Sequence, residues 1–200
     1  MHDLADVPQT EEARTEAAEL MISKNNLVTP KSGEPIIAAN QDFITGSYLL
    51  TRKDNFLTRH QFVHILSYLD DASLELEIPP PAVWKPQRLW TGKQVFNLLM
   101  RPNKKSPILV NLEAKNKTSG KPPPGYLPDM MNNDGYLVVR NSEIMCGHMD
   151  KATIGDGKKL SLYNVLLRDY GVDAAAVAMN RTAKLCARYF SKCPSRGHPF

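Results

Sequence analysis

The residues best suited to chemistry are an acidic and a basic side chain that stand next to each other after an apolar stretch. Asp150 and Lys151 occur in NSEIMCGHMDKATIG, and two glycines follow within a few residues. The residues before them have the pattern of a strand pair, which would hold the two charges on a stiff support where functional loops are often carried. The alternative interpretation is a solvated surface ion pair, which contributes little to stability or function.

Histidine and cysteine spacing gives a weaker indication of a metal site. His60 and His64 lie four residues apart on a predicted helix, but the acid of an HExxH motif and a third ligand are missing. Cys146, Cys186 and Cys193 are odd in number and widely spaced, with no CxxC pair. The histidines are therefore interpreted as solvated, and the cysteines as free thiols of a reducing compartment.

No other motif in the sequence indicates catalysis. A nucleophile elbow, a dinucleotide fingerprint and a pair of catalytic carboxylates are all missing, and Gly120-Lys121 lacks the upstream glycine of a P-loop. Lysines between residues 104 and 121 could contact phosphate, but no aromatic residues are interleaved to stack on bases. The residues by themselves predict an α+β domain without chemistry of its own.

Composition is that of an ordinary globular protein. The chain has 200 residues, 42% of them hydrophobic and 23% charged, which predicts one folded domain with a core. The formal net charge of +4 is spread along the chain, so it permits a nucleic-acid partner without requiring one. No apolar run is long enough to span a membrane, and the first residues do not resemble a signal peptide, which predicts a soluble intracellular protein.

Hydrophobic periodicity and capping residues predict most of the helices. Two capping boxes, Thr58 with Gln61 and Thr91 with Gln94, mark the clearest helix starts. Gly171 is expected to separate the last two helices. The predicted helices are residues 11–23, 43–50, 58–69, 91–100, 161–170 and 173–190.

Strand signals are fewer, so the predicted fold class is a helix-rich α+β domain with a small antiparallel hairpin. The hairpin joins Tyr136–Arg140 to residues 142–145. Short strands are also expected at residues 74–78 and 108–112, and residues 116–133 are expected to be irregular. Two tryptophans are expected to anchor the proline-rich stretch that follows the first of these strands.

Four motifs in series give the sequence a resemblance to a known family. They are VPQTEEARTEAAELM, NLVTPKSGEPIIAANQDFITGSYLLT, KPQRLWTGKQ and MDKATIG. In this order they closely resemble the largest subunits of multisubunit DNA-directed RNA polymerases, most of all that of eukaryotic RNA polymerase III. The resemblance implies a pore domain at residues 25–190, an N-terminal helix at 1–24 that is a remnant of the active-site domain, and an unstructured tail at 191–200.

This resemblance implies a role in DNA-templated transcription in the nucleus, in a nucleotidyltransferase complex. The implied partners are other polymerase subunits, the DNA template, RNA and nucleoside triphosphates, with no membrane. Catalysis in the family uses Mg²⁺ held by three aspartates in NADFDGD just before the VPQT motif. Here MHDLAD stands there, and Asp3 and Asp6 do not reproduce that spacing. The chain is therefore expected to contain no catalytic residue, to bind no Mg²⁺ and to be inactive alone.

The same resemblance suggests candidates for a phosphate path. MDKATIG matches an acidic-Lys loop that faces the pore in the family, so Lys151 would lie beside a triphosphate or an RNA 3′ end. Asp150 would limit the attraction, and Thr153 with the glycines would shape the turn. Gln41 and Asp42 are weaker candidates for the same neighbourhood, with helix capping as the alternative.

A different class of function remains open on the sequence. Both ends diverge from the family while the middle matches it, as a truncated product, a partial gene model or a splice variant would. The chain could then be a non-catalytic binding module that competes for polymerase subunits or RNA. In either case we expect exposed apolar surface and a projecting N-terminal helix, because neighbouring domains would cover both.

Overall fold

The computed structural model describes residues 7–69, 75–117 and 135–192. Its α-helices are α1 (Glu11–Glu19), α2 (Gln41–Thr51), α3 (Arg59–Leu66), α4 (Gly92–Met100), α5 (Lys151–Ile154) and α6 (Leu162–Lys192). Two 3₁₀ helices are η1 (Ser23–Asn26) and η2 (Ser67–Leu69). The strands are β1 (Phe56–Leu57), β2 (Trp90–Thr91), β3 (Leu112–Lys115), β4 (Tyr136–Arg140) and β5 (Glu143–Cys146). These elements confirm the predicted helix-rich α+β class.

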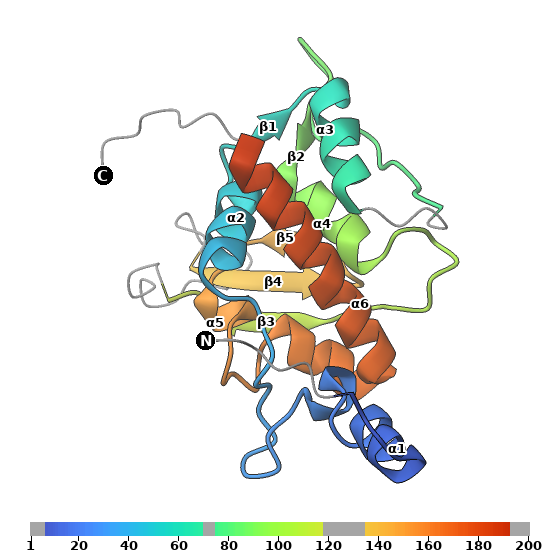
Figure 1. Cartoon of the computed structure of the whole chain (residues 1–200). Coiled ribbons are helices and arrows are strands. Elements are labelled where there is room, and N and C mark those ends of the chain that lie inside the picture. Colours follow the sequence, from blue (N-terminus) through green and yellow to red (C-terminus); the bar gives the residue numbers. More distant parts are fainter. Residues whose placement is uncertain (1–6, 70–74, 118–134, 193–200) are drawn as a thin grey trace.

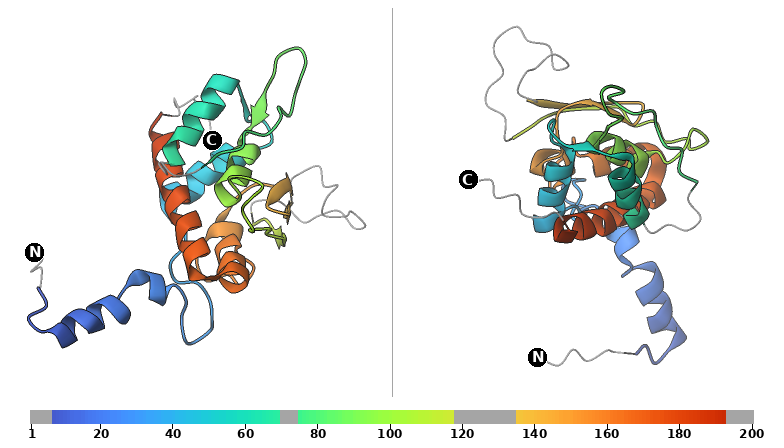
Figure 2. Two further views of the ribbon diagram at one scale, coloured as in Figure 1. Left: turned by 90° about the vertical axis from the view of Figure 1, so that its right-hand side faces the viewer. Right: turned by 90° about the horizontal axis from the view of Figure 1, so that it is seen from above.

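Helices α2, α4 and α6 form one layer, and the sheet of β3, β4 and β5 lies against it (Figures 1 and 2). α6 runs along the whole layer, with one non-helical residue, Gly171, at a φ of 88°. The predicted break between the last two helices is thus confirmed as a kink. α2 and α6 approach closely because Gly46 has no side chain: a Cβ there would lie 3.0 Å from the Cβ of Cys186.

Local capping explains why the central helices begin where they do. The capping boxes predicted at Thr58 and Thr91 are both present, and they start α3 and α4. Phe62 and Phe96 from these helices are fully buried in the core. The backbone N–H of Ile144 donates to Asn97 Oδ1 at 2.9 Å, which ties β5 to α4.

The three-stranded sheet is antiparallel in the order β3-β4-β5. The predicted hairpin is confirmed, with Asn141 and Ser142 at its turn, both at positive φ. The strand predicted at residues 108–112 was wrong, because β3 begins only at its last residue. Residues 108–110 bind the turn instead: Ser142 Oγ donates to Ile108 O and accepts from Val110 N, both at 2.9 Å.

The proline-rich stretch also differs from prediction. No strand forms at residues 75–78, because this segment bonds to the loop after α4, where Glu77 N donates to Pro102 O. Only one of the two tryptophans is an anchor. Trp90 is 5% exposed and donates its indole N–H to Pro79 O, whereas Trp84 is 60% exposed.

The N-terminal helix projects from the rest of the protein, as expected (Figure 2). α1 has no buried residue, and the large side chains of Leu20 and Met21 after it are mostly exposed. The predicted helix 11–23 ends earlier because Asn25 and Asn26 donate their side-chain N–H groups to Glu19 O and Leu20 O. The expected exposed apolar surface is therefore present.

Some predictions fall outside the described residues. Most of the expected irregular segment 116–133 and most of the expected tail 191–200 lie there, although α6 includes residues 191 and 192. Within the described ranges, no helix combines the length and apolar character needed to cross a membrane.

Candidate functional site

The loop after β5 ends in α5, a single helical turn that Asp150 caps. One carboxylate oxygen, Oδ1, accepts from Ala152 N at 2.9 Å and from Thr153 N at 3.1 Å. In return the Asp150 N–H donates to Thr153 Oγ1 at 2.9 Å, which completes a capping box. Asp150 and Thr153 are 4% and 0% exposed, so both side chains hold the loop together.

The second carboxylate oxygen of Asp150 binds a distant part of the chain. Oδ2 accepts from the Lys117 N–H at 2.7 Å, just beyond the end of β3. Three backbone N–H groups thus surround one buried carboxylate, which accounts for its burial without a basic side chain. The geometry gives Asp150 a structural role in joining α5 to β3.

Lys151 has a different environment from its neighbour. Its side chain is 63% exposed, and it pairs with Asp156 Oδ1 at 3.8 Å, a contact at the outer limit of an ion pair. The ammonium therefore stays solvated and can move. Such a group can attract a passing phosphate without holding it in a fixed bidentate geometry.

The other two candidates lie at the start of α2. Asn40 is the N-cap of this helix, because its Oδ1 accepts from Gln41 N at 2.8 Å. Gln41 has a φ of 36°, which is uncommon for a residue other than glycine, and Asp42 lies in the first turn, where the helix dipole favours an acid. Both side chains are exposed, so the capping role belongs to Asn40 and not to them.

Backbone contacts connect these two groups of candidates. Ala39 N, just before α2, donates to Ile154 O at the end of α5 at 3.2 Å. At the other end of α2, Thr51 Oγ1 accepts from Met149 N at 2.8 Å, next to Asp150. The loop that carries Lys151 is therefore fixed to both ends of α2. Thr51 and the Lys117 N–H are parts of this arrangement that the sequence did not indicate, because both lie far before the motif in the chain.

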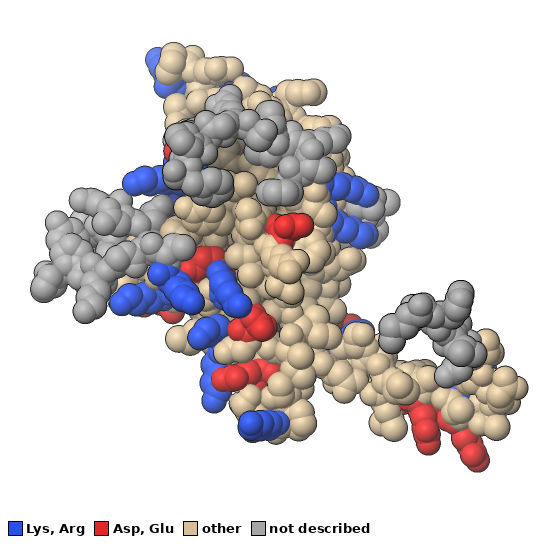
Figure 3. Space-filling view, turned by 60° about the vertical axis from the view of Figure 1, so that its left-hand side comes forward, with Lys and Arg blue, Asp and Glu red and all other residues tan. Residues whose placement is uncertain are grey.

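The surface on the α5 side of the molecule carries charges of both signs (Figure 3). The segments of β3 and α5 and the loop after α5 contribute exposed lysines, Lys115, Lys151, Lys158 and Lys159, and the same loop contributes the exposed Asp156. A surface with interspersed acids attracts anions weakly and locally. An anion would therefore respond to single lysines, and not to a uniform basic field.

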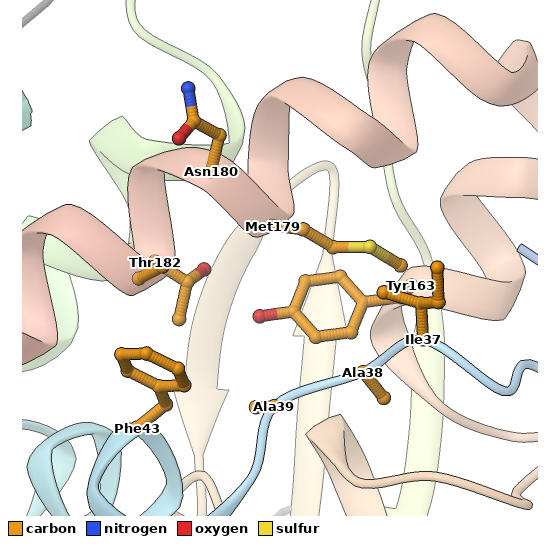
Figure 4. Close-up of a pocket in the computed structure, with 9 residues that line it drawn as sticks. Ile37, Ala38, Ala39, Phe43, Tyr163, Met179, Asn180 and Thr182 are labelled. Atoms are coloured by element: carbon orange, nitrogen blue, oxygen red, sulfur yellow. The ribbon is translucent and has the colours of Figure 1, made fainter. Parts of the chain in front are cut away.

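A separate pocket lies between α6 and residues 37–39 (Figure 4). It has a volume of about 270 Å³, and its lining includes Phe43, Met179 and Tyr163. Burial raises the pKa of the Tyr163 hydroxyl far above its ordinary value, which removes it from acid–base chemistry near neutral pH. The pocket is suited to an apolar side chain and offers no reactive group.

The histidine and cysteine candidates that the structure describes, His60, His64, Cys146 and Cys186, do not gather at a metal site, and Cys193 lies outside the described residues. The rings of His60 and His64 stack with centroids 6.2 Å apart, and His64 Nε2 lies 2.8 Å from the Tyr68 hydroxyl. Burial raises the pKa of the Cys186 thiol to about 11, so the thiol stays protonated at neutral pH. In the part of the chain that the structure describes, no three His, Cys, Asp or Glu side chains come together as metal ligands would.

Comparison with known families assigns this fold and loop to a class of protein. A family model described as RNA polymerase Rpb1, domain 3, matches residues 26–193. The chain therefore belongs to the RNA polymerase Rpb1 domain 3 family. This finding confirms the resemblance to polymerase largest subunits that the four sequence motifs indicated.

The similar proteins point to one polymerase within that class. The chain is 61% identical over 183 residues to the DNA-directed RNA polymerase III subunit RPC1 of Debaryomyces hansenii. It is 58% identical to the protein of that name from Saccharomyces cerevisiae and 47% identical to the one from Homo sapiens. Each match covers 92% of this chain but only 13% of the relative's length.

Proposed function

We propose that the chain acts as the domain 3 segment of the largest subunit of RNA polymerase III, in DNA-templated transcription in the nucleus. The observation that carries this proposal is the 61% identity to an RNA polymerase III subunit across nearly the whole chain. Its partners would be the other polymerase subunits, with the DNA template, RNA and nucleoside triphosphates bound by the assembled complex.

Within that complex, we propose that the α5 loop borders the pore for nucleoside triphosphates and for the 3′ end of backtracked RNA. Support comes from the contrast between neighbours: Asp150 is buried as a cap, while the Lys151 ammonium is exposed and held by one long ion pair. Gln41 and Asp42 would lie along the same path, because α2 is bonded to this loop at both ends.

Replacing Lys151 by alanine in an assembled RNA polymerase should change its kinetics and not its assembly. We expect slower elongation at low nucleotide concentration or altered cleavage of backtracked transcripts, by about two- to ten-fold, since one mobile charge near a phosphate is worth roughly 1 kcal/mol. Stepwise elongation and transcript cleavage on defined templates measure this effect.

Lys105→Ala is the matched control for this test. Lys105 is also an exposed lysine in an ion pair, with Glu75 at 3.0 Å, but it lies in the loop after α4. If both variant polymerases assemble and match the parent at every nucleotide concentration, Lys151 has no part in a phosphate path.

Catalysis is proposed to reside elsewhere in the complex, with Mg²⁺ bound by residues outside this chain. The purified chain should therefore show no template-dependent nucleotide incorporation at any Mg²⁺ concentration. A radiolabelled primer-extension assay tests this, with intact polymerase as the positive control. Incorporation by a preparation free of polymerase would refute the assignment of catalysis to other segments.

The exposed helix α1 and the apolar residues after it support a second candidate function, a non-catalytic binding module that competes for polymerase subunits or RNA. α1 has no buried residue, and Leu20, Met21 and Ile22 present apolar side chains to solvent. The competing module predicts that added chain lowers the yield of assembled polymerase during reconstitution. The domain 3 role, by contrast, does not predict that added chain lowers this yield.

A further inference from the structure

A groove between the start of α3 and the loop before β2 has features that the pore proposal does not use. It has a volume of about 590 Å³, and we call it the Trp84 groove. Its lining includes two tryptophans, two prolines, a histidine and two arginines, and none of its lining residues is acidic. The residues used below are Arg59, His60, Pro81, Trp84, Pro86 and Arg88.

The loop that presents this groove is held in a defined shape. Val83 and Leu89 exchange two backbone hydrogen bonds, of 3.1 and 2.9 Å, so residues 84–88 form the tip of a small hairpin. This loop stands out from the body of the molecule before β2 (Figure 2). Its base is fixed by the buried indole of Trp90. The site is therefore preorganised, which lowers the entropic cost of binding.

Trp84 and Arg88 form a pair at this tip. The Arg88 guanidinium carbon lies 5.6 Å from the centroid of the Trp84 ring, within the range of a cation–π contact. Trp84 nevertheless remains 60% exposed, a large apolar area to leave in water. Tryptophan and arginine are the residue types that contribute most often to protein–protein binding energy.

Among the residues that the structure describes, the acids closest before the groove in the chain pair with lysines that do not line it. Glu75 and Glu77 bind Lys105 and Lys104, at 3.0 and 2.8 Å. The tip itself contributes Lys85 and Arg88, and Arg59 lies at the first position of α3. Complementarity of charge therefore calls for an acidic partner.

We propose that the Trp84 groove is a docking site for an acidic segment of another protein. Carboxylates of this segment pair with Arg59 and Arg88, and an apolar side chain packs against Trp84 between the prolines. Single-stranded nucleic acid is a poorer fit, because such sites use several aromatic residues along a continuous basic track. Of the two tryptophans that line the groove only Trp84 is exposed, so the groove does not offer a row of large aromatic rings.

Selection from a library of random short peptides on the 200-residue chain tests the chemistry of the partner. We expect enriched peptides to combine Asp or Glu with at least one large apolar residue. Counter-selection on the Trp84→Ala chain should remove them. Enrichment of peptides without acidic residues, or of peptides that bind the Trp84→Ala chain equally well, would overturn the proposal.

Titration of a selected peptide then tests the residues. Trp84→Ala and Arg88→Glu should each weaken binding by about ten-fold or more, because both side chains contact the segment. Lys31→Glu, which reverses the charge of an exposed lysine in the loop between Leu27 and Pro35, should change affinity by less than about two-fold. Both groove side chains are exposed, and circular dichroism of each variant verifies that it is folded.

An oligouridylate RNA serves as the competing probe. If it binds the chain more tightly than the selected peptide and loses affinity in the Trp84→Ala variant, the groove is a nucleic-acid site and the proposal is wrong. Equal losses in the Lys31→Glu and Arg88→Glu variants would also overturn it, because binding would then follow net charge alone. These outcomes do not depend on Lys151, so the pore proposal stands or falls separately.

Discussion

Gly147→Ala should destabilise the chain by about 4 kcal/mol or more, because backbone strain and a steric collision add at one position. Gly147 follows β5 at a φ of +86°, where residues other than glycine are strained. An added Cβ would also lie 2.2 Å from Tyr136 O and 2.5 Å from Leu137 Cα. These are atoms of the β4 backbone, which cannot move aside without breaking the sheet.

Gly157→Ala is the control that separates strain from collision. Gly157 also has a positive φ, of +63°, but nothing lies within 4 Å of an added Cβ. It should cost only about 1–2 kcal/mol, the ordinary penalty of a left-handed residue. Thermal unfolding followed by circular dichroism measures both variants, and a chain of this size loses roughly 2–4 °C per kcal/mol. Equal losses would show that the predicted collision is relieved by movement of β5.

Features governed by neighbouring residues could be predicted from the sequence. The capping boxes at Thr58 and Thr91 satisfy backbone groups within one turn, so they are visible in the sequence and start α3 and α4 as expected. Asn141 likewise indicates the hairpin turn, and Gly171 the kink in α6. Each of these predictions depends on a few consecutive residues.

Features governed by distant contacts could not be predicted. The segment 108–110 has strand-like residues, but the Ser142 side chain binds its backbone across the fold and β3 starts later. Trp84 and Trp90 look equivalent in the sequence, yet Trp90 is buried with its indole N–H bonded to Pro79 O, whereas Trp84 is 60% exposed. In both cases the deciding partner lies many residues away.

The candidate site shows the same division between local and distant contacts. Asp150 followed three residues later by Thr153 is itself a capping pattern, so the sequence contained a signal for α5 that its four-residue length obscured. The contact of Asp150 with the Lys117 N–H could not be foreseen, because these residues lie 33 positions apart. That contact separates the structural role of Asp150 from the exposed position of Lys151.

Asp150→Ala should lower stability by about 3 kcal/mol, because it removes the acceptor of three backbone N–H groups at a buried position. Asp150→Asn keeps one acceptor oxygen and should lose less. Asp156→Ala is the control: this carboxylate is 64% exposed and pairs with Lys151 at 3.8 Å, so its loss should stay within about 0.5 kcal/mol.

Urea unfolding of the three variants gives the free energies directly. If Asp150→Ala and Asp156→Ala are equally stable, the Asp150 cap does not stabilise α5, and its carboxylate contributes no more than the exposed one of Asp156. If Asp150→Ala alone is destabilised, the adjacent residues Asp150 and Lys151 have different roles. The acid then fixes the loop to β3, and the loop presents the Lys151 ammonium to solvent, held by the 3.8 Å pair with Asp156. A polymerase carrying Asp150→Ala would consequently lose assembly before it lost the function proposed for Lys151, the reverse of the order expected for Lys151→Ala.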